Sequence, residues 1–270
     1  MSGQHAPALE ASIAGIGFWT RGLPDWDAAR AYVTDGQMPN EAPARPSPQL
    51  LAPNERRRAP ETVAVALDVA LAACAAAGRD PALLASVFAS THGDLAITDY
   101  MCATLVGAPR SISPTRFHNS VHNAAAGYWT IGAGAQAPAT AISAYDASFA
   151  QGLLEALVQI ATGTEAVLLV AYDSTATGPL GRTSPSSGLL GGALLLVRDA
   201  VPGAPRLSLR LRDSADAAGI ETVAGPLARL AAGNAMTPML PVFEALALCA
   251  ARTSLAAGAG RVMDLEFDHA

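Results

Sequence analysis

The chain has 270 residues, of which 51% are hydrophobic and only 15% are charged. This length is enough to bury a sizeable core, and the composition fits a buried sheet covered by alanine-rich helices. The formal net charge of −6 argues against nucleic-acid binding, which requires a basic face.

The first predicted elements are a strand that ends in glycines, a helix, a proline-rich surface loop and a second helix: 11–18, 25–33, 37–54 and 60–78. Asp25 is placed to cap the first helix. Pro60 in the first turn and Gly78 just past the end are the usual limits of a helix such as the second. Asp68 interrupts the apolar run within it, so we expect a soluble helix here and no membrane span.

The middle of the chain alternates short apolar strands with longer helices. We expect strands at 85–90, 137–143, 166–172 and 188–197, and helices at 94–107, about 119–134 and 147–161. Residues 112–117 and 173–188 are expected to form loops. The last two of these strands are expected to pair with each other.

The remaining segments are predicted with weaker patterns. Residues 206–213 alternate apolar and charged side chains, which indicates a half-exposed or edge strand. A helix near 221–232, an amphipathic helix at 241–258 and a strand at 262–267 complete the chain. Strands that alternate with helices of this length favour a mainly parallel sheet with helices on its faces.

Cysteine usage and the N-terminal residues favour a cytoplasmic protein. Cys74, Cys102 and Cys249 are far apart and form no Cys-x-x-Cys pair, so we expect neither disulfides nor a thiolate metal site. Residues 1–18 lack the basic and apolar regions of a signal peptide.

Two stretches, "SPTRFHNSVHNAAAGYWTIGAG" and "ATAISAYDASFAQGLLEAL", carry a more specific signal. They contain Ser113–Pro114, Asn119, Asn123 with Ala126–Gly127, and Ser143–Ser148. In this order and spacing they resemble the first half of the β-ketoacyl synthases, which have the thiolase fold. In that family the last motif reads Thr-Ala-Cys followed by small residues and a helix.

The resemblance covers about residues 60–198 and implies an α/β, thiolase-like fold, with a mixed sheet of βαβαβαββ type covered by helices. Residues 1–200 would be the ketosynthase-like N-terminal half. Residues 201–270 would be a truncated remnant of the second half, packed on the first in a single compact domain.

The chain departs from the family at the residues that carry the chemistry. Tyr145 occupies the position of the nucleophilic cysteine. Phenols lose their proton only at about pH 10, so a tyrosine is a poor acyl acceptor at neutral pH. Beyond residue 200 neither histidine motif of the family is present, and the only histidine is His269. We therefore expect no catalytic residues, no cofactor and no condensing activity.

A ketosynthase-like chain without a nucleophile resembles the chain-length factors, and its short form is most similar to those of aryl-polyene or xanthomonadin-type clusters. The resemblance implies a heterodimer with a ketosynthase, in which this subunit helps to bound the acyl or polyene chain. The acyl carrier protein would dock mainly on the partner.

Several side chains are candidates for lining the interface or the acyl tunnel, each with a simpler alternative. Tyr145 is either a plug or a hydrogen-bonding post in the vestigial pocket, or an ordinary core tyrosine, and Asp146 is expected to cap the following helix. Four others either line the interface and the far end of the tunnel or pack in the core: Tyr100, Met101, Leu105 and Phe117. His118, in the interface loop, has an interface or hydrogen-bonding role, and Asn119 is a further tunnel or interface candidate.

Other function classes have less support. An autonomous acyltransferase would use Cys102, a metal-dependent hydrolase would use His92, His118 and His122, and a self-associating structural protein would need no ketosynthase. No carboxylate stands at a convincing spacing beside these histidines, so we expect no metal. A serine hydrolase elbow and a complete dinucleotide-binding glycine motif are both missing from the sequence.

Overall fold

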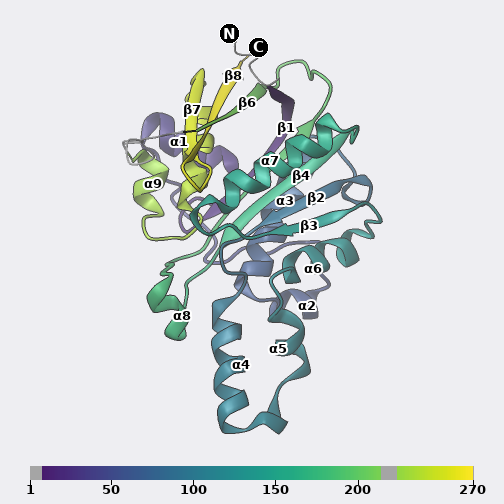
Figure 1. Cartoon of the computed structure of the whole chain (residues 1–270), viewed down its shortest axis with the longest axis vertical. Coiled ribbons are helices and arrows are strands. Elements are labelled where there is room, and N and C mark those ends of the chain that lie inside the picture. Colours follow the sequence, from purple (N-terminus) through teal and green to yellow (C-terminus); the bar gives the residue numbers. More distant parts are fainter. Residues whose placement is uncertain (1–7, 214–223, 270) are drawn as a thin grey trace.

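The computed structural model describes residues 8–213 and 224–269. They form one eight-stranded sheet with helices on both faces (Figure 1), in the order β3-β2-β4-β5-β1-β6-β8-β7. The strands are β1 Leu9–Thr20, β2 Ala85–Ala89, β3 Ala139–Ile142, β4 Ala166–Asp173, β5 Leu190–Val197, β6 Arg206–Asp213, β7 Arg252–Ala256 and β8 Arg261–Asp268.

The sheet is mixed, as the resemblance implies, but the prediction that it is mainly parallel is wrong. Only β2 pairs in parallel, with β3 on one side and β4 on the other. The five remaining pairings are antiparallel. A parallel pair needs a crossover element that covers the sheet, whereas the chain between β4 and β5 forms only one short helix.

The helices have the following bounds: α1 Trp26–Asp35, α2 Pro53–Arg58, α3 Glu61–Ala76, α4 Leu95–Gly107, α5 Pro114–Asn119, α6 Ala124–Ala133, α7 Ser148–Ala161, α8 Gly178–Thr183, α9 Pro226–Leu230 and α10 Leu240–Ala247. Two hydrophobic cores result, one on each face of the sheet. One lies under α3 and α6, and the other lies under α1, α7, α9 and α10. Neighbouring residues of a central strand alternate between them, as Val87 and Phe88 do.

Helix α3 lies unusually close to β1. A Cβ atom on Gly15 would lie 2.1 Å from the carbonyl oxygen of Ala73, and one on Gly17 would lie 2.0 Å from that of Val69. Both distances are far below van der Waals contact, so only glycine permits this approach. The glycines of the first predicted strand therefore set the spacing between the sheet and its central helix.

Most of the remaining predicted elements are present, with several corrections. Residues 178–183, within the predicted loop 173–188, form helix α8. Residues 114–119 form a helix (α5) rather than a loop, because Ser113 caps it and Pro114 occupies its first turn. The predicted helix 241–258 ends at Ala247, and residues 252–256 form β7, which pairs with β8. Cys249, at φ 48°, reverses the chain between them.

The alternating segment 206–213 is half-exposed, as predicted, but it is not an edge strand, because β6 lies between β1 and β8. The first residues of the helix expected near 221–232 lie outside the described residues, and α9 occupies Pro226–Leu230.

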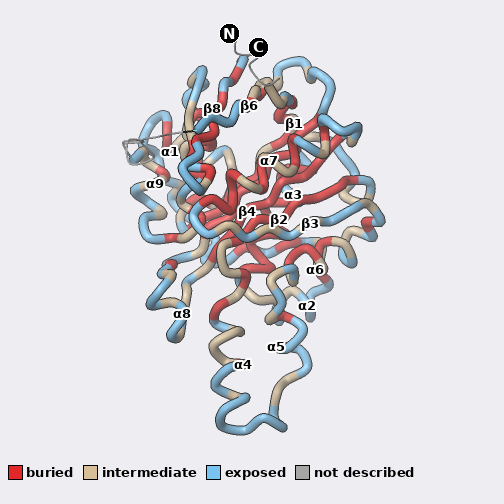
Figure 2. The backbone as a smooth tube through the Cα atoms, viewed as in Figure 1, coloured by how far each residue is buried: buried red, intermediate tan, exposed pale blue. Residues whose placement is uncertain are grey.

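Helices α4 and α5, joined by η2 (Pro109–Ser111), project away from the sheet as an arm, which we call the α4–α5 arm, residues 95–119 (Figure 1). Figure 2 shows that most of its backbone belongs to exposed or intermediate residues. Only Leu95 and Met101 of α4 are buried, although Asp99 is its single charged residue. Across residues 8–213 and 224–269, none of the helices is both long and apolar enough to cross a membrane.

Candidate functional site

The turn between β3 and α7 holds Tyr145 in a left-handed conformation, at φ 55°. Two hydroxyl groups fix the turn by donating to the Tyr145 carbonyl oxygen, Ser148 Oγ at 2.6 Å and Thr91 Oγ1 at 3.2 Å. Ser148 also accepts a hydrogen bond from the backbone N–H of Ala144. A tyrosine in this conformation is strained, and the surrounding hydrogen bonds hold it there.

The side chain of Tyr145 is 60% exposed. The expectation that it could be an ordinary core tyrosine is therefore wrong, because the left-handed turn directs the side chain away from the core. The expected cap by Asp146 is also wrong. Helix α7 begins after Ala147 without a side-chain cap, and Asp146 lies within the 3-10 turn η3, Tyr145–Ala147.

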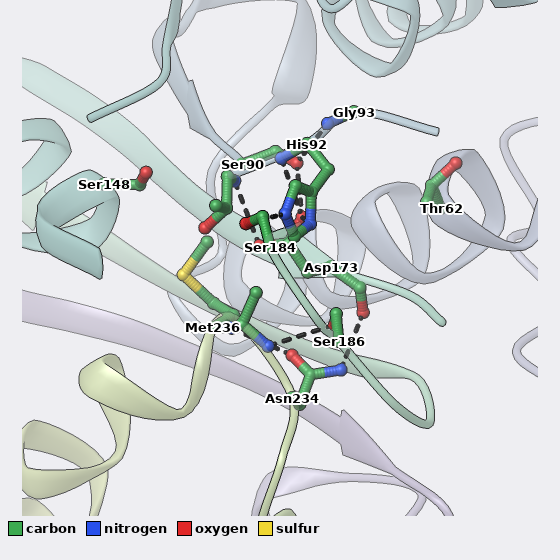
Figure 3. Close-up of polar contacts among 12 residues, drawn as sticks. Thr62, Ser90, His92, Gly93, Ser148, Asp173, Ser184, Ser186, Asn234 and Met236 are labelled. Carbon is green, nitrogen blue, oxygen red and sulfur yellow. Dashed lines mark hydrogen bonds and ion pairs between the residues drawn. The ribbon is translucent and has the colours of Figure 1, made fainter. Parts of the chain in front are cut away.

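The loop that follows β2 (residues 90–94, the β2–α4 loop) lies against this turn and takes part in a buried polar cluster (Figure 3). Asp173, the last residue of β4, is fully buried and lies at the centre of the cluster. The carboxylate accepts hydrogen bonds from Ser90 Oγ at 2.7 Å and from the backbone N–H groups of Thr91 and His92 at 3.0 and 3.2 Å. Burial raises the pKa of Asp173, and these donors partly oppose the rise.

The cluster ties the β2–α4 loop to two later segments. His92 Nε2 lies 2.7 Å from Ser184 Oγ, and His92 Nδ1 lies 3.9 Å from Asp173 Oδ1. Asn234 donates through its side-chain amide to the carbonyl oxygens of Asp173 and Ser187. Sequence reasoning missed Asp173 as the organising residue, although a single carboxylate at the end of an apolar strand was a usable signal.

The candidates on the α4–α5 arm are in contrasting environments. Met101 and Asn119 are buried, whereas Leu105, Phe117 and His118 are exposed. Ordinary core packing is therefore excluded for Leu105 and Phe117. Whether any of these side chains lines a tunnel or an interface stays a prediction.

The base of the arm is held together by polar and aromatic contacts. The Arg116 guanidinium lies 3.9 Å from the centre of the Tyr100 ring, and His118 contacts Tyr128 edge-to-face at 5.8 Å between ring centres. Oδ1 of Asn119 is buried without a hydrogen-bond partner. These contacts fix α5 against α4 and α6 while leaving the Phe117 ring exposed.

The structure separates the residues proposed for other chemistries. Burial and the nearby charge of Asp80 raise the pKa of Cys74 to about 12, so this thiol stays protonated, while Cys102 and Cys249 are exposed. His122 bonds the backbone carbonyl of Ser90 and is not grouped with His118. Within the described part of the chain, no group of three or more His, Cys, Asp or Glu side chains is arranged to hold a metal ion.

Comparison with known protein families identifies the family of this chain. Residues 26–219, more than two thirds of the chain, match the family described as the N-terminal domain of β-ketoacyl synthases. The chain belongs to this family. A search of curated proteins finds no match.

Several solved structures share the fold. The chain aligns with the complex of the ketosynthase ApeO and its chain length factor ApeC from Xenorhabdus doucetiae at 24% identity and a TM-score of 0.71, over 96% of this chain and 99% of the other. The ishigamide ketosynthase/chain length factor aligns at 15% identity and a TM-score of 0.72, over 96% and 99%.

A third structure is only partly covered. The module 1 ketosynthase of the bacillaene synthase from Bacillus amyloliquefaciens FZB42 aligns at 16% identity and a TM-score of 0.57, over 77% of this chain but only 47% of the other. The β-ketoacyl synthase-like fold predicted from the sequence is thus confirmed.

Proposed function

We propose that this chain is a chain-length-factor-like subunit that pairs with a ketosynthase and does not itself catalyse condensation. The observation that carries the proposal is Tyr145, which occupies the strained turn between β3 and α7. By the resemblance, the nucleophilic cysteine of the family stands at this position. The turn is kept, with its hydrogen bonds to Thr91 and Ser148, but its side chain is a phenol instead of a thiol.

The free edge of the sheet supports a partner at β3. Within the described residues β3 pairs only with β2, and Ala139 and Ala141 are exposed. An uncovered strand edge readily pairs with another chain. A ketosynthase whose own edge strand continues the sheet fits this edge, and it would supply the cysteine and the histidines.

A set of large, exposed apolar side chains supports the same partner. We call it the apolar band and define it as Leu105, Val106, Phe117, Val121, Ile131 and Tyr145, all of them large and exposed. Its members lie on or beside α4, α5 and α6 or in the turn after β3. Helix α4 has a single charged residue, Asp99, and a helix as apolar as this is normally buried, so the arm has the character of a segment that a partner covers.

The finer parts of the proposal follow from the resemblance. The subunit helps to bound the growing chain in a type II polyketide or fatty-acid-like pathway, of the aryl-polyene kind, with the acyl carrier protein docking mainly on the ketosynthase. Residues 201–270 are the truncated remnant of the family's second half. Two of the similar structures are of a ketosynthase with a chain length factor, which supports this assignment.

Co-expression tests the pairing. The chain is produced with a ketosynthase that is encoded beside it and that keeps its Thr-Ala-Cys and both histidine motifs. We expect a 1:1 complex by size-exclusion chromatography with light scattering. A stable homodimer that ignores the ketosynthase would contradict the proposal.

Product analysis of the reconstituted complex tests the role in chain length. Phe117→Trp and Phe117→Ala should shift the longest product in opposite directions if this side chain limits the tunnel. Leu248→Ala, at an exposed position beyond α10, is the matched control and should leave the products unchanged. Tyr145→Phe should preserve condensation, because the phenol has no part in it; loss of condensation in this variant contradicts a non-catalytic subunit.

A further inference from the structure

Three side chains from separate parts of the chain converge beside the β2–α4 loop (Figure 3). His92 belongs to the loop, Asp173 ends β4, and Ser184 follows α8. His92 Nε2 lies 2.7 Å from the Ser184 hydroxyl oxygen, and Nδ1 of the same ring lies 3.9 Å from Asp173 Oδ1. Hydroxyl, imidazole and carboxylate thus stand in the order of a nucleophile, its base and the group that orients the base.

Hydrogen bonds to both carboxyl oxygens favour the ionised form of Asp173 and oppose the rise in pKa that burial causes. The backbone N–H groups of Thr91 and His92 donate to different oxygens of Asp173, Oδ2 and Oδ1. A backbone N–H can only donate, so both carboxyl oxygens must accept, which a protonated carboxylic acid does poorly. The fully buried side chain therefore presents its negative charge to the ring of His92, whose own side chain is 9% exposed.

This charge decides which nitrogen of His92 carries the proton. Nδ1 is buried, has no hydrogen-bond partner and is the ring nitrogen nearest the carboxylate, so a proton is favoured there. Nε2 then has a free lone pair, and Ser184 must donate its hydroxyl proton to it. The 3.9 Å separation exceeds a hydrogen bond, as is frequent for catalytic pairs in the absence of substrate.

The other histidines of the described residues have different surroundings. Nε2 of His122 and of His269 bonds a backbone carbonyl oxygen, which is a structural arrangement. His118 contacts the ring of Tyr128. Among the described histidines, only His92 combines a bond to a side-chain hydroxyl with a carboxylate on its other side. Ser184 itself is partly exposed.

We propose that Ser184 is a nucleophile that takes an acyl group from a thioester and transfers it to water. Ser184 Oγ forms a bond to the carbonyl carbon while its proton moves to His92 Nε2, the carbon–sulfur bond breaks, and the thiolate leaves and recovers that proton. Water then attacks the seryl ester, gives one proton to Nε2, and the carbon–Oγ bond breaks as Ser184 regains its hydrogen. The products are a carboxylic acid and a thiol, and no carbon–carbon bond is formed.

Acyl thioesters are the substrate class that this site suits. A thiolate leaves without prior protonation, whereas the amine of an amide leaves only when the protonated imidazole is placed to deliver its proton to the nitrogen. A thioester therefore makes the smaller demand on the geometry of this site. The activity needs neither the ketosynthase nor the apolar band, and it is independent of the proposed function.

The test uses the full chain with butyryl-N-acetylcysteamine, measuring the release of thiol, and a fluorophosphonate that marks reactive serines. We expect turnover above the buffer rate and a phosphonate adduct that peptide mapping places on Ser184. Ser184→Ala and His92→Gln should each lower kcat/KM by at least about a hundredfold. Ser187→Ala, an exposed serine of the same loop, is the matched control and should keep the full rate and the adduct.

Thermal unfolding of Ser184→Ala should stay close to that of the wild type, since the change removes one hydroxyl from a partly exposed residue. An adduct on Ser184 that disappears in His92→Gln supports activation by the imidazole. A wild-type rate equal to that of buffer, or an unchanged rate in Ser184→Ala, overturns the proposal. Ketosynthase binding by Ser184→Ala is measured in parallel and should be normal, so that failure of this site and failure of the proposed function remain distinguishable.

Discussion

Replacing Phe117 by alanine tests whether the α4–α5 arm is a binding surface. Phe117 is 61% exposed, and a fully covered phenylalanine side chain buries roughly 200 Å². A partner that covers the exposed part would remove about 120 Å² of apolar surface from water, worth about 3 kcal/mol at ~25 cal/mol per Å². Phe117→Ala should therefore weaken ketosynthase binding by up to roughly a hundredfold in Kd.

The assay is a titration of the purified ketosynthase by isothermal calorimetry, accompanied by thermal unfolding of the free chain. The free chain should unfold within about 0.5 kcal/mol of the wild type, because the lost side chain is exposed there. Leu248→Ala removes a side chain of comparable exposure (56%) beside α10, which packs on β7 at the opposite edge of the sheet from β3. A Kd for Phe117→Ala within twofold of wild type, or equal losses in both variants, would refute the reasoning.

Three further predictions concern the scaffold. Gly17→Ala should lower the free energy of unfolding in urea by at least about 2 kcal/mol, because the new Cβ would meet the Val69 carbonyl oxygen at 2.0 Å. Asp173→Asn should cost about 3 kcal/mol in the same assay, because an amide N–H₂ replaces one of two oxygens that accept from backbone N–H groups. Burial alone would raise the pKa of Asp264, but hydrogen bonds and the charge of Arg212 lower it below its ordinary value. The stabilising contribution of the ionised Asp264 side chain is therefore complete above about pH 4 and is lost as the pH falls through the lowered pKa. Acid unfolding curves of the wild type and of Asp264→Asn should converge at low pH.

Local signals were sufficient to predict the elements whose ends are chemically marked. Asp25 accepts from the Ala28 N–H at the start of α1, as its position before an amphipathic run predicts. Pro60 and Gly78 flank α3, and Gly78 has the positive φ, 60°, that favours glycine. Strands β4 and β5 are buried at every position and read as uninterrupted apolar runs. In these cases the local sequence and the tertiary environment favour the same structure.

The structure of the segment after α10 could not be predicted from the local sequence pattern. Residues 241–258 are rich in alanine and leucine and predict one long helix, yet Arg252–Ala256 forms β7. This strand is stabilised by its pairing with β8, a partner that the local pattern cannot show. The direction of the strands was mispredicted for a related reason, since a loop of similar length can return a chain antiparallel or lead to a crossover.

The two candidate sites differ in how much of each can be predicted from the sequence. The Tyr145 turn is found because its neighbours form a contiguous motif. The Ser184, His92 and Asp173 cluster has no motif, because 92 residues separate Ser184 from His92 and 81 separate His92 from Asp173. Sequence spacing argued against a serine nucleophile, and only the meeting of the β2–α4 loop with the ends of β4 and α8 brings these groups together.

Under the proposed function, the strained turn at Tyr145 gives a physical reason for keeping the family's active-site turn without its nucleophile. A left-handed non-glycine residue costs of order 1–2 kcal/mol and persists only where its surroundings impose it. Here Thr91 and Ser148 donate to the Tyr145 carbonyl oxygen, and Ser143 donates to the carbonyl oxygen of Thr91. The turn thereby joins the end of β3, the free edge of the sheet, to the β2–α4 loop. Relaxing the turn would disturb that edge, whereas the exposed side chain at position 145 takes no part in these bonds. Under the proposed function, a subunit that keeps its edge strand for a partner must therefore keep the strained turn, whereas the side chain at position 145 is free to change from cysteine to tyrosine.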